Sequence, residues 1–316
     1  MELSTFTVEW QHVKEVVSGK ANLKDFYLKT DPLTVILLYA LITMLITLIA
    51  CHTGKKNDYT FLDPFWPTIP TIVIVHLMIH GYFNNRFSTR FLLLFPILVV
   101  WHYHLEDLFI RRGGLAGIED HRWGYVKRNL GYDRLRLILL TVFFVSFFQS
   151  GLLVVIAIPA VKLYYSFDLP LSIPDFVFAG LMSASLVCEF RIDSVMQNFQ
   201  NAKRIYKRDS IITPGYSKKE LERGFCTRGI YAYSRRPNHL AEQLIWICLY
   251  LWGAYISGQW INWTIMAPVI FSLFILQSSL FTDAISQERY PDFRRYRETV
   301  SLWIPSRSAW VEEKEI

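Results

Sequence analysis

Residues 33–51 form an unbroken apolar run, LTVILLYALITMLITLIAC, without a charged side chain. A bilayer core about 30 Å thick needs roughly 20 such residues in a helix to cross it. Backbone polar groups in lipid must be hydrogen-bonded within the segment, and the alternating pattern of barrel strands is absent, so helices are expected. Similar runs recur at about 65–83, 90–105, 136–161, 172–190, 240–256 and 262–282. The sequence therefore predicts an all-α polytopic membrane protein with about seven transmembrane helices.

The composition also favours a membrane protein over a soluble one. Of the 316 residues, 52% are hydrophobic and only 19% are charged, which is little charge to cover the surface of a soluble domain. A soluble helical protein with buried helices is the weaker alternative. The run over 136–161 is longer than one crossing requires, and we expect it to tilt or kink near Gly151 and Pro159.

Basic residues are distributed unevenly between the two sides of the predicted spans. The side that holds 52–64, 106–136, 191–238 and the tail 283–316 carries 26 of the 33 Lys and Arg residues, and the other side carries 7. The positive-inside rule places the C-terminus in the cytoplasm and the N-terminus on the opposite side. Because the charge follows topology, the net charge of +6 needs no nucleic acid to explain it.

The chain is organised around these spans. The first 30 residues are polar and hold no signal-peptide core, so the first span is expected to act as its own insertion signal. Four cysteines without a CxxC pair predict neither a disulfide framework nor a zinc site. We divide the chain into an N-terminal polar segment (1–32), the first three spans (33–105) and a C-terminal membrane domain (106–316).

The segment 224–246, GFCTRGIYAYSRRPNHLAEQLIW, carries the clearest chemical signal. Pro237 suits the first turn of a helix, and the free N–H groups at a helix start favour anions. Arg235 and Arg236 add fixed positive charge, and a guanidinium can bind phosphate bidentately. The segment therefore predicts a site for a phosphate-bearing cofactor, while a basic loop flanking the membrane is the simpler alternative.

Four motifs resemble those of the steroid 5α-reductase-like (DUF1295) family. The segment 233–238, YSRRPN, with Glu242 resembles the family's Y-S-R-H-P-N-Y-x-x-E signature. EFRID at 189–193, with Gln197 and Phe199, resembles its E-x-x-x-D-x-Q-x-x-F helix. EDHRW at 119–123 is similar to its E-D-x-R loop, and YPDFRRY at 290–296, followed by Ile304-Pro305, is similar to its terminal pattern. All four stand in the family's order within about residues 100–305.

The resemblance implies a helical membrane reductase that takes hydride from NADPH. It implies that residues of the signature contact the cofactor, namely Tyr233, Arg235, Arg236, Asn238 and Glu242. It further implies that the E-x-x-x-D helix contributes to the same polar site, through Glu189, Asp193 and Gln197. Steps of four residues place these last three on one helix face, for which a solvated face beside the membrane is the alternative.

The sequence departs from the family signature at three positions. Arg236 replaces the family's His, His239 replaces its Tyr, and Ala241 stands where many members have Gly. A guanidinium does not exchange protons as an imidazole does. A non-catalytic relative that still binds nucleotide therefore stays open as an alternative.

Reduction of a conjugated C=C bond needs a proton donor as well as a hydride. A positioned acid has to polarise the carbonyl of the enone while the cofactor supplies the hydride. We assign this role to Tyr103 and Glu106, which lie three residues apart near the cytoplasmic end of the third span. Other titratable side chains in the second and third spans, where interhelical hydrogen bonding is the alternative, are His76, His80, His102 and His104.

The resemblance implies a lipidic substrate, a sterol-, steroid- or fatty-acyl-like enone that enters from the bilayer, and a location in the endoplasmic reticulum. A second enzyme class shares part of the pattern. Membrane methyltransferases of the isoprenylcysteine type use S-adenosylmethionine and carry R-H-P-x-Y near a helix start. The Pro237-Asn238 pair and the helix over 189–197 favour the reductase. No metal is expected, because His76–His80 is an isolated HxxxH pair and no HxxHH box accompanies it.

Overall fold

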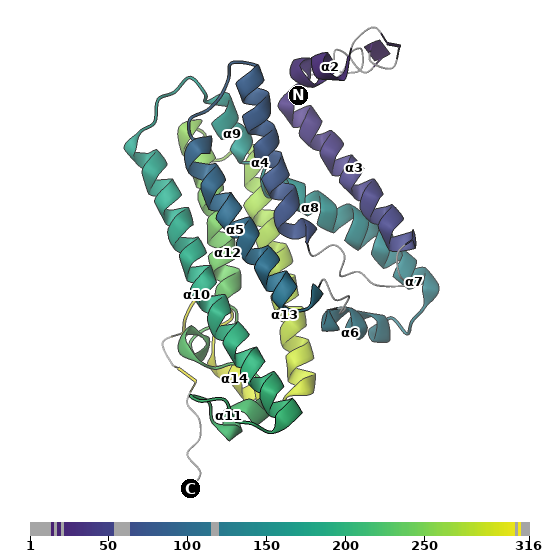
Figure 1. Ribbon diagram of the computed structural model, residues 1–316, viewed down its shortest axis with the longest axis vertical. Coiled ribbons are helices and arrows are strands. Elements are labelled where there is room, and N and C mark those ends of the chain that lie inside the picture. The colour runs from purple at the N-terminus through teal and green to yellow at the C-terminus, as the bar shows by residue number, and fades with distance from the viewer. Residues whose placement is uncertain are drawn as a thin grey trace. The chain divides into compact units, whose positions relative to one another are not determined.

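The computed structural model describes residues 14–15, 18–19, 22–53, 64–114, 120–306 and 309–310. Within these ranges the chain is helical, and the single bridge pairing joins Ser234 to Ser301, which confirms the all-α prediction. The α-helices, labelled in Figure 1, are α2 (Leu23–Lys29), α3 (Pro32–Thr53), α4 (Phe65–Phe83), α5 (Phe91–Arg111), α6 (His121–Asn129), α7 (Arg134–Leu139), α8 (Ser150–Val155), α9 (Ala160–Tyr165), α10 (Ile173–Asp209), α11 (Lys218–Arg223), α12 (Pro237–Ile256), α13 (Met266–Arg289) and α14 (Phe293–Thr299). A π-helix, η3 (Leu140–Gln149), lies between α7 and α8, and two short 3-10 helices are η4 (Gly229–Ala232) and η5 (Trp263–Ile265).

Five helical segments in the described part of the chain are long and apolar enough to cross a membrane. They are Pro32–Ala50, Phe91–Arg111, Arg134–Tyr165, Ile173–Asp209 and Trp263–Arg289. The second and sixth predicted spans correspond to α4 and α12, which have 19 and 20 residues but carry polar side chains such as His76, His80 and Glu242. Five apolar helices in the described part of the chain fit an integral membrane protein, and the expected count of seven is not confirmed.

The predicted break in the fourth span lies at Pro159. α8 ends at Val155, and a turn precedes α9, whose N-cap residue is Pro159. Gly151 lies inside α8 and does not interrupt it. A Cβ atom there would lie 3.0 Å from Cε of Met44, so the glycine allows α8 to pack closely on α3 (Figure 1).

Backbone contacts divide the chain into two units, and neither unit is continuous in sequence. The first contains the residues up to Ala179 together with Leu249–Ala267, and the second contains Gly180–Cys248 and Pro268–Ile316. Residues of α10, α12 and α13 therefore belong to both units. The sequence boundaries after residues 32 and 105 stay a prediction about how the chain is organised.

A buried ion pair organises the interior of the first unit. Nε of Arg90 donates to Oδ1 of Asp175 over 2.8 Å, and both side chains are fully buried. The Arg90 guanidinium also donates to the carbonyls of Leu169 and Pro170, and the indole of Trp252 donates to Asp175 over 2.7 Å. A buried charge needs such a partner and further hydrogen bonds, and here both are present.

His76 and His80 make interhelical hydrogen bonds in the first unit. Nε2 of His76 lies 3.1 Å from the Pro32 carbonyl, and its Nδ1 lies 3.0 Å from the Tyr27 hydroxyl. Nε2 of His80 lies 3.1 Å from the Thr30 carbonyl, and its Nδ1 lies 2.8 Å from the Tyr164 hydroxyl. Because a carbonyl accepts from N–H, each ring is the Nε2–H tautomer with Nδ1 as the acceptor. The His76 ring therefore ties α4 to the start of α3, and the His80 ring ties α4 to the end of α2 and to α9.

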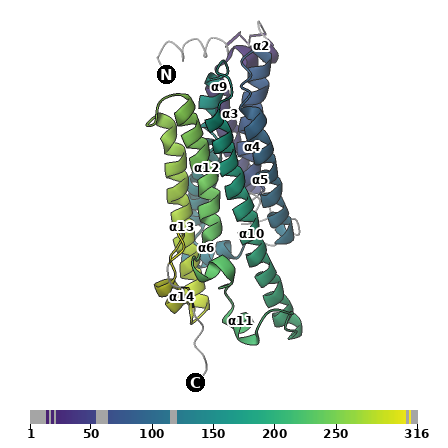
Figure 2. The same ribbon diagram turned by 90° about the vertical axis from the view of Figure 1, so that its left-hand side faces the viewer.

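The second unit contains the signature segment, residues 233–242, which runs into the start of α12. In this unit α12 and α13 lie side by side, α14 lies beside the end of α13, and α11 lies beside the end of α10 (Figure 2). A hydrophobic cluster, mostly aromatic, packs around α14. It comprises Phe225, Phe293, Tyr296 and Val300 with the partly buried Tyr290 and Trp310.

Candidate functional site

The signature segment is held by the C-terminal arm, which we define as residues 301–306. The backbone N–H groups of Arg235 and Arg236 donate to the carbonyls of Ser301 and Leu302 over 2.9 and 2.8 Å. The N–H of Ser306 donates to the carbonyl of Tyr233 over 2.8 Å. The backbone of residues 233–236, just before α12 begins at Pro237, is therefore hydrogen-bonded to the C-terminal arm through both its donors and its acceptors. This pairing brings together two of the four motifs recognised in the sequence.

Asp283 of α13 binds both arginines of the signature. Nε of Arg235 donates to Oδ2 of Asp283 over 2.9 Å, and Nη2 of Arg236 donates to Oδ1 over 3.3 Å. Arg235 is 8% exposed and also donates to the carbonyls of Arg297 and Val300, so it secures the segment. Arg236 is 18% exposed, and its buried Nε has no hydrogen-bond partner. Of the two guanidinium groups, Arg236 has the donor that a ligand can use.

Three acidic side chains form the carboxylate cluster, which we define as Glu189, Asp193 and Glu242. All three are buried, and carboxylate oxygens of Glu189 and Asp193 lie within 4.8 Å of one another. Glu242 is close enough to Glu189 to interact with it electrostatically. Nδ2 of Asn238 donates to Oδ1 of Asp193 over 3.3 Å, whereas Oε2 of Glu189 has no hydrogen-bond partner. An unpaired buried acceptor is costly, so this oxygen suits a ligand that brings an N–H or O–H group.

The structure brings these residues together but not the whole expected set. Gln197 is half-buried, and its side chain donates to Asn201, one turn further along α10, over 3.4 Å. The side chain of Tyr233 is 41% exposed. Both stay predicted cofactor contacts, and neither has a hydrogen bond to the carboxylate cluster in the described structure.

Tyr231 lies beside the cluster and was missed from the sequence. It is buried between Phe199, Leu221 and Cys226, and its hydroxyl has no hydrogen-bond partner. The phenol is close enough to Asp193 and Arg236 to interact with their charges. Burial, followed by the negative charge of Asp193, raises the pKa of the Tyr231 phenol well above 10.0, so the hydroxyl keeps its proton at neutral pH. The sequence signal was its place in the segment 224–246, two residues before the signature begins at Tyr233.

Asp283 was not among the site residues predicted from the sequence, although its position in an apolar helix is a signal for one. It lies in the apolar sequence of α13, and an ionisable residue there is a functional candidate by default. Its partners could not be named, because Arg235 and Arg236 lie more than 45 positions away in the chain.

His239 replaces the family's Tyr and is hydrogen-bonded to α13. Its Nδ1 lies 2.7 Å from Oγ of Ser279, which donates in turn to the Ile275 carbonyl. The indole of Trp303, in the C-terminal arm, donates to the same Oγ over 3.2 Å. Ser279 therefore joins the start of α12 to the C-terminal arm.

Comparison with known proteins shows which family the chain belongs to. A family model described as a protein of unknown function, DUF1295, matches residues 49–300. The chain belongs to the DUF1295 family. This is the steroid 5α-reductase-like family that the motifs indicated. The chain is also similar to the uncharacterized protein C594.04c of Schizosaccharomyces pombe, with 30% identity over 307 residues, 96% of this chain and 88% of the relative. No solved structure matches this chain.

The E-D-x-R loop of this DUF1295 chain is only partly described, because Glu119 and the side chain of His121 lie outside the described residues. Asp120 caps α6 by accepting the backbone N–H of Arg122 over 2.8 Å, and it also accepts from the Arg122 guanidinium at 2.9 and 3.0 Å. The loop residues therefore stabilise a helix start.

Tyr103 and Glu106 lie on α5, in the first unit of this family member. The side chain of Tyr103 is 69% exposed, and Glu106 is half-buried. Their assignment as proton donors stays a prediction.

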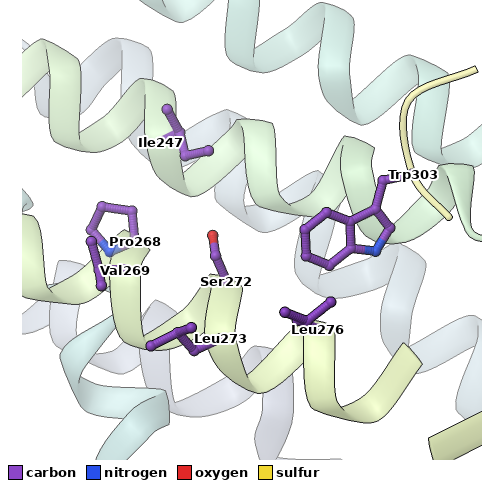
Figure 3. A pocket seen from close by; sticks show the side chains of 7 residues that line it. All are labelled: Ile247, Pro268, Val269, Ser272, Leu273, Leu276 and Trp303. Carbon is purple, nitrogen blue, oxygen red and sulfur yellow. The ribbon is translucent and has the colours of Figure 1, made fainter. Parts of the chain in front are cut away.

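A hollow that we call the apolar groove lies between α12 and α13 in the second unit (Figure 3). It has a volume of about 410 Å³ and is lined by Ile247, Pro268, Val269, Ser272, Leu273, Leu276 and Trp303. Figure 3 shows Trp303 and Leu276 at one end of the groove and Pro268 and Val269 at the other. The Trp303 end is the one that Ser279 connects to His239. The groove therefore starts within a candidate span and ends beside the signature.

Proposed function

We propose that this protein is an NADPH-dependent membrane reductase that reduces the C=C bond of a lipidic enone. The observation that supports this most is the convergence of unpaired buried polar atoms on the signature: Oε2 of Glu189, Nε of Arg236 and the hydroxyl of Tyr231. These atoms belong to, or lie next to, the residues that the family resemblance assigns to the cofactor. We further propose the endoplasmic reticulum as location, with the C-terminus in the cytoplasm.

The available groups match the chemistry of NADPH. Arg236 would hold a phosphate, because a guanidinium N–H donor suits a phosphate oxygen. Glu189 and Asp193 would accept hydrogen bonds from the ribose hydroxyls or the carboxamide, which bring O–H and N–H groups. NADPH, when bound, supplies the hydride. Arg235 acts as a positioning residue, since its guanidinium binds Asp283 and two carbonyls.

Proton delivery needs a group that carries a proton at physiological pH. The buried Tyr231 phenol carries one, and its hydroxyl has no hydrogen-bond partner among the described residues. It joins Tyr103 and Glu106 as a candidate donor to the carbonyl oxygen of the enone. The apolar groove offers a hydrocarbon-lined site for the lipid part of the substrate, reached from the bilayer because Leu273 in its wall is 61% exposed.

The proposal is tested by NADPH binding to the purified, detergent-solubilised protein, with S-adenosylmethionine as the rival ligand. Asp193→Asn should weaken NADPH binding by about 10- to 100-fold, the usual worth of a hydrogen bond to a charged group. Ser194→Ala is the matched control, because the exposed Ser194 hydroxyl donates to Phe190 within α10. Equal affinity in the two variants would remove the carboxylate cluster from the cofactor site.

S-adenosylmethionine is the informative rival because its ammonium group would also suit acidic side chains. It has no phosphate, however, and would leave Nε of Arg236 unused. Binding of S-adenosylmethionine instead of NADPH would favour the methyltransferase. Binding of NADPH without turnover of any lipid enone would favour a non-catalytic relative.

A further inference from the structure

A second hollow, which we call the basic groove, lies outside the proposed cofactor site. It has a volume of about 470 Å³ and is formed by the last turns of α10 and the end of α13, with lining residues Gln200, Lys203, Arg204, Lys207, Arg208, Arg289 and Tyr290. Five of these seven side chains are cationic. Arg208 is paired with its neighbour Asp209 over 2.8 Å, which leaves a strong positive excess. None of the seven belongs to the carboxylate cluster or to the signature.

Lys203 is held in place at one corner of the basic groove. Its Nζ donates to the Gly224 carbonyl over 2.9 Å and lies 5.6 and 5.7 Å from the ring centres of Phe199 and Tyr290. Gly224 has φ of 85°, and a Cβ atom there would lie 2.4 Å from Cε1 of Tyr290. An ammonium group has three N–H donors, so two can still point to an anion. The corner is therefore pre-organised, which lowers the entropy lost when an anion binds.

The position of the basic groove along the helices selects the kind of anion. α10 has 37 residues and is about 55 Å long, whereas the hydrocarbon core is about 30 Å thick, so its basic end extends beyond the membrane. Arg289 lies six residues after Asp283, about 9 Å along α13. The predicted orientation puts this end in the cytoplasm. Clusters of four to eight Lys and Arg just cytoplasmic of a span attract anionic lipid headgroups.

We propose that the basic groove binds the headgroup of an anionic phospholipid that carries phosphomonoesters. Lys203 lies about 45 Å along α10 from Ile173, which is about 15 Å past a hydrocarbon core of about 30 Å that begins with this helix. This is roughly beyond the headgroup layer, which is about 5–8 Å deep on each side. Phosphomonoesters on an extended headgroup project further from the membrane than the phosphodiester that links the headgroup to the lipid, and they carry more charge. They can therefore reach the cations of the basic groove. The lipid would anchor the cytoplasmic ends of α10 and α13 to the leaflet. This inference does not rest on the proposed reductase activity.

The test uses the full-length protein in nanodiscs of phosphatidylcholine, with or without a polyphosphoinositide, and measures lipid retention by native mass spectrometry. The double variant Lys207→Ala/Arg289→Ala should bind the phosphoinositide about 30-fold more weakly, since each cation near an anionic leaflet contributes roughly fivefold. Lys218→Ala/Arg294→Ala is the control, because it removes the same charge from exposed positions outside the groove. Equal weakening in both variants would reduce the effect to net charge and overturn the proposal.

Two further arms identify the source of the phosphate. Soluble inositol trisphosphate should bind more weakly than the bilayer lipid, and equal affinity would make the groove a site for soluble phosphates. NADPH affinity should be the same in the groove variant and the wild type. A parallel loss of NADPH binding would assign the basic groove to the cofactor, and the lipid proposal would fall while the reductase proposal stood.

Discussion

Asp283 should control the stability of the proposed cofactor site, and Asp283→Asn tests this. The carboxylate is 1% exposed and accepts from both Arg235 and Arg236. Asparagine has the same shape, but it removes the charge and replaces one acceptor oxygen with an N–H group that faces a guanidinium. The variant therefore leaves two buried or half-buried cations without their anion.

The magnitude follows from the surroundings of each arginine. Breaking a buried ion pair by removing one partner costs about 3–5 kcal/mol in the free energy of unfolding. Arg235 keeps its carbonyl acceptors at Arg297 and Val300, so we expect the low end, about 3 kcal/mol. The Arg236 contact is longer, at 3.3 Å, and this side chain is 18% exposed. We therefore expect about 2 kcal/mol of coupling between Asp283 and Arg235 and about 1 kcal/mol between Asp283 and Arg236.

The assay is a double-mutant cycle in detergent, with Asp283→Asn combined with Arg235→Gln or with Arg236→Gln. Unfolding is followed by intrinsic fluorescence in denaturant, and NADPH affinity is measured on each folded variant. Thr282→Ala is the neighbouring control, since its hydroxyl donates only to Ser278 of the same helix. A coupling to Arg236 as large as that to Arg235, or an Asp283 variant as stable as the Thr282 control, would refute the reasoning.

Further outcomes follow from other sites. Arg90→Met should destabilise the protein by about 3–5 kcal/mol, because it leaves Asp175 buried without its cation; chemical denaturation measures this, and Arg90→Met/Asp175→Asn should recover part of the loss. Burial raises the pKa of Cys226 from 9.0 to about 11, so maleimide at pH 7.5 should leave it unlabelled by peptide mass spectrometry until the protein is denatured. The same shift favours the folded state below pH 9, and this contribution should be lost as the pH rises towards 11. Arg236→His should preserve or raise any reductase activity in an NADPH-consumption assay, since it restores the family residue; a sharp loss would give the arginine its own role. Tags at the two termini should be accessible on opposite sides of the membrane in a protease-protection assay. Tags on the same side would mean an even number of spans and contradict the prediction of seven.

Local patterns predicted part of the candidate site. Glu189 and Asp193 are four residues apart, and one helical turn brings their carboxylates together. The same rule included Gln197, whose side chain is half-buried and donates to Asn201, so its place in the site stays a prediction. The family motif linked Asn238 to the same place, and its hydrogen bond to Asp193 agrees with this grouping.

Long-range partners could not be predicted in the same way. Asp283 and the C-terminal arm meet the signature only after α12 and α13 have packed side by side, and no periodicity within one segment encodes this. The span count of seven is not confirmed, for a related reason. Hydropathy treats Glu242 as a polar residue of α12, whereas the fold buries it in the carboxylate cluster. The two discontinuous units likewise depend on contacts between distant segments.

The C-terminal arm makes the shape of the signature depend on a segment far along the chain. Residues 301–306 supply the carbonyls that fix the backbone of Arg235 and Arg236. A variant in which these residues are replaced by a flexible linker should still insert its spans but leave this backbone without its acceptors. Membrane insertion and completion of the proposed cofactor site are therefore separable properties of the chain.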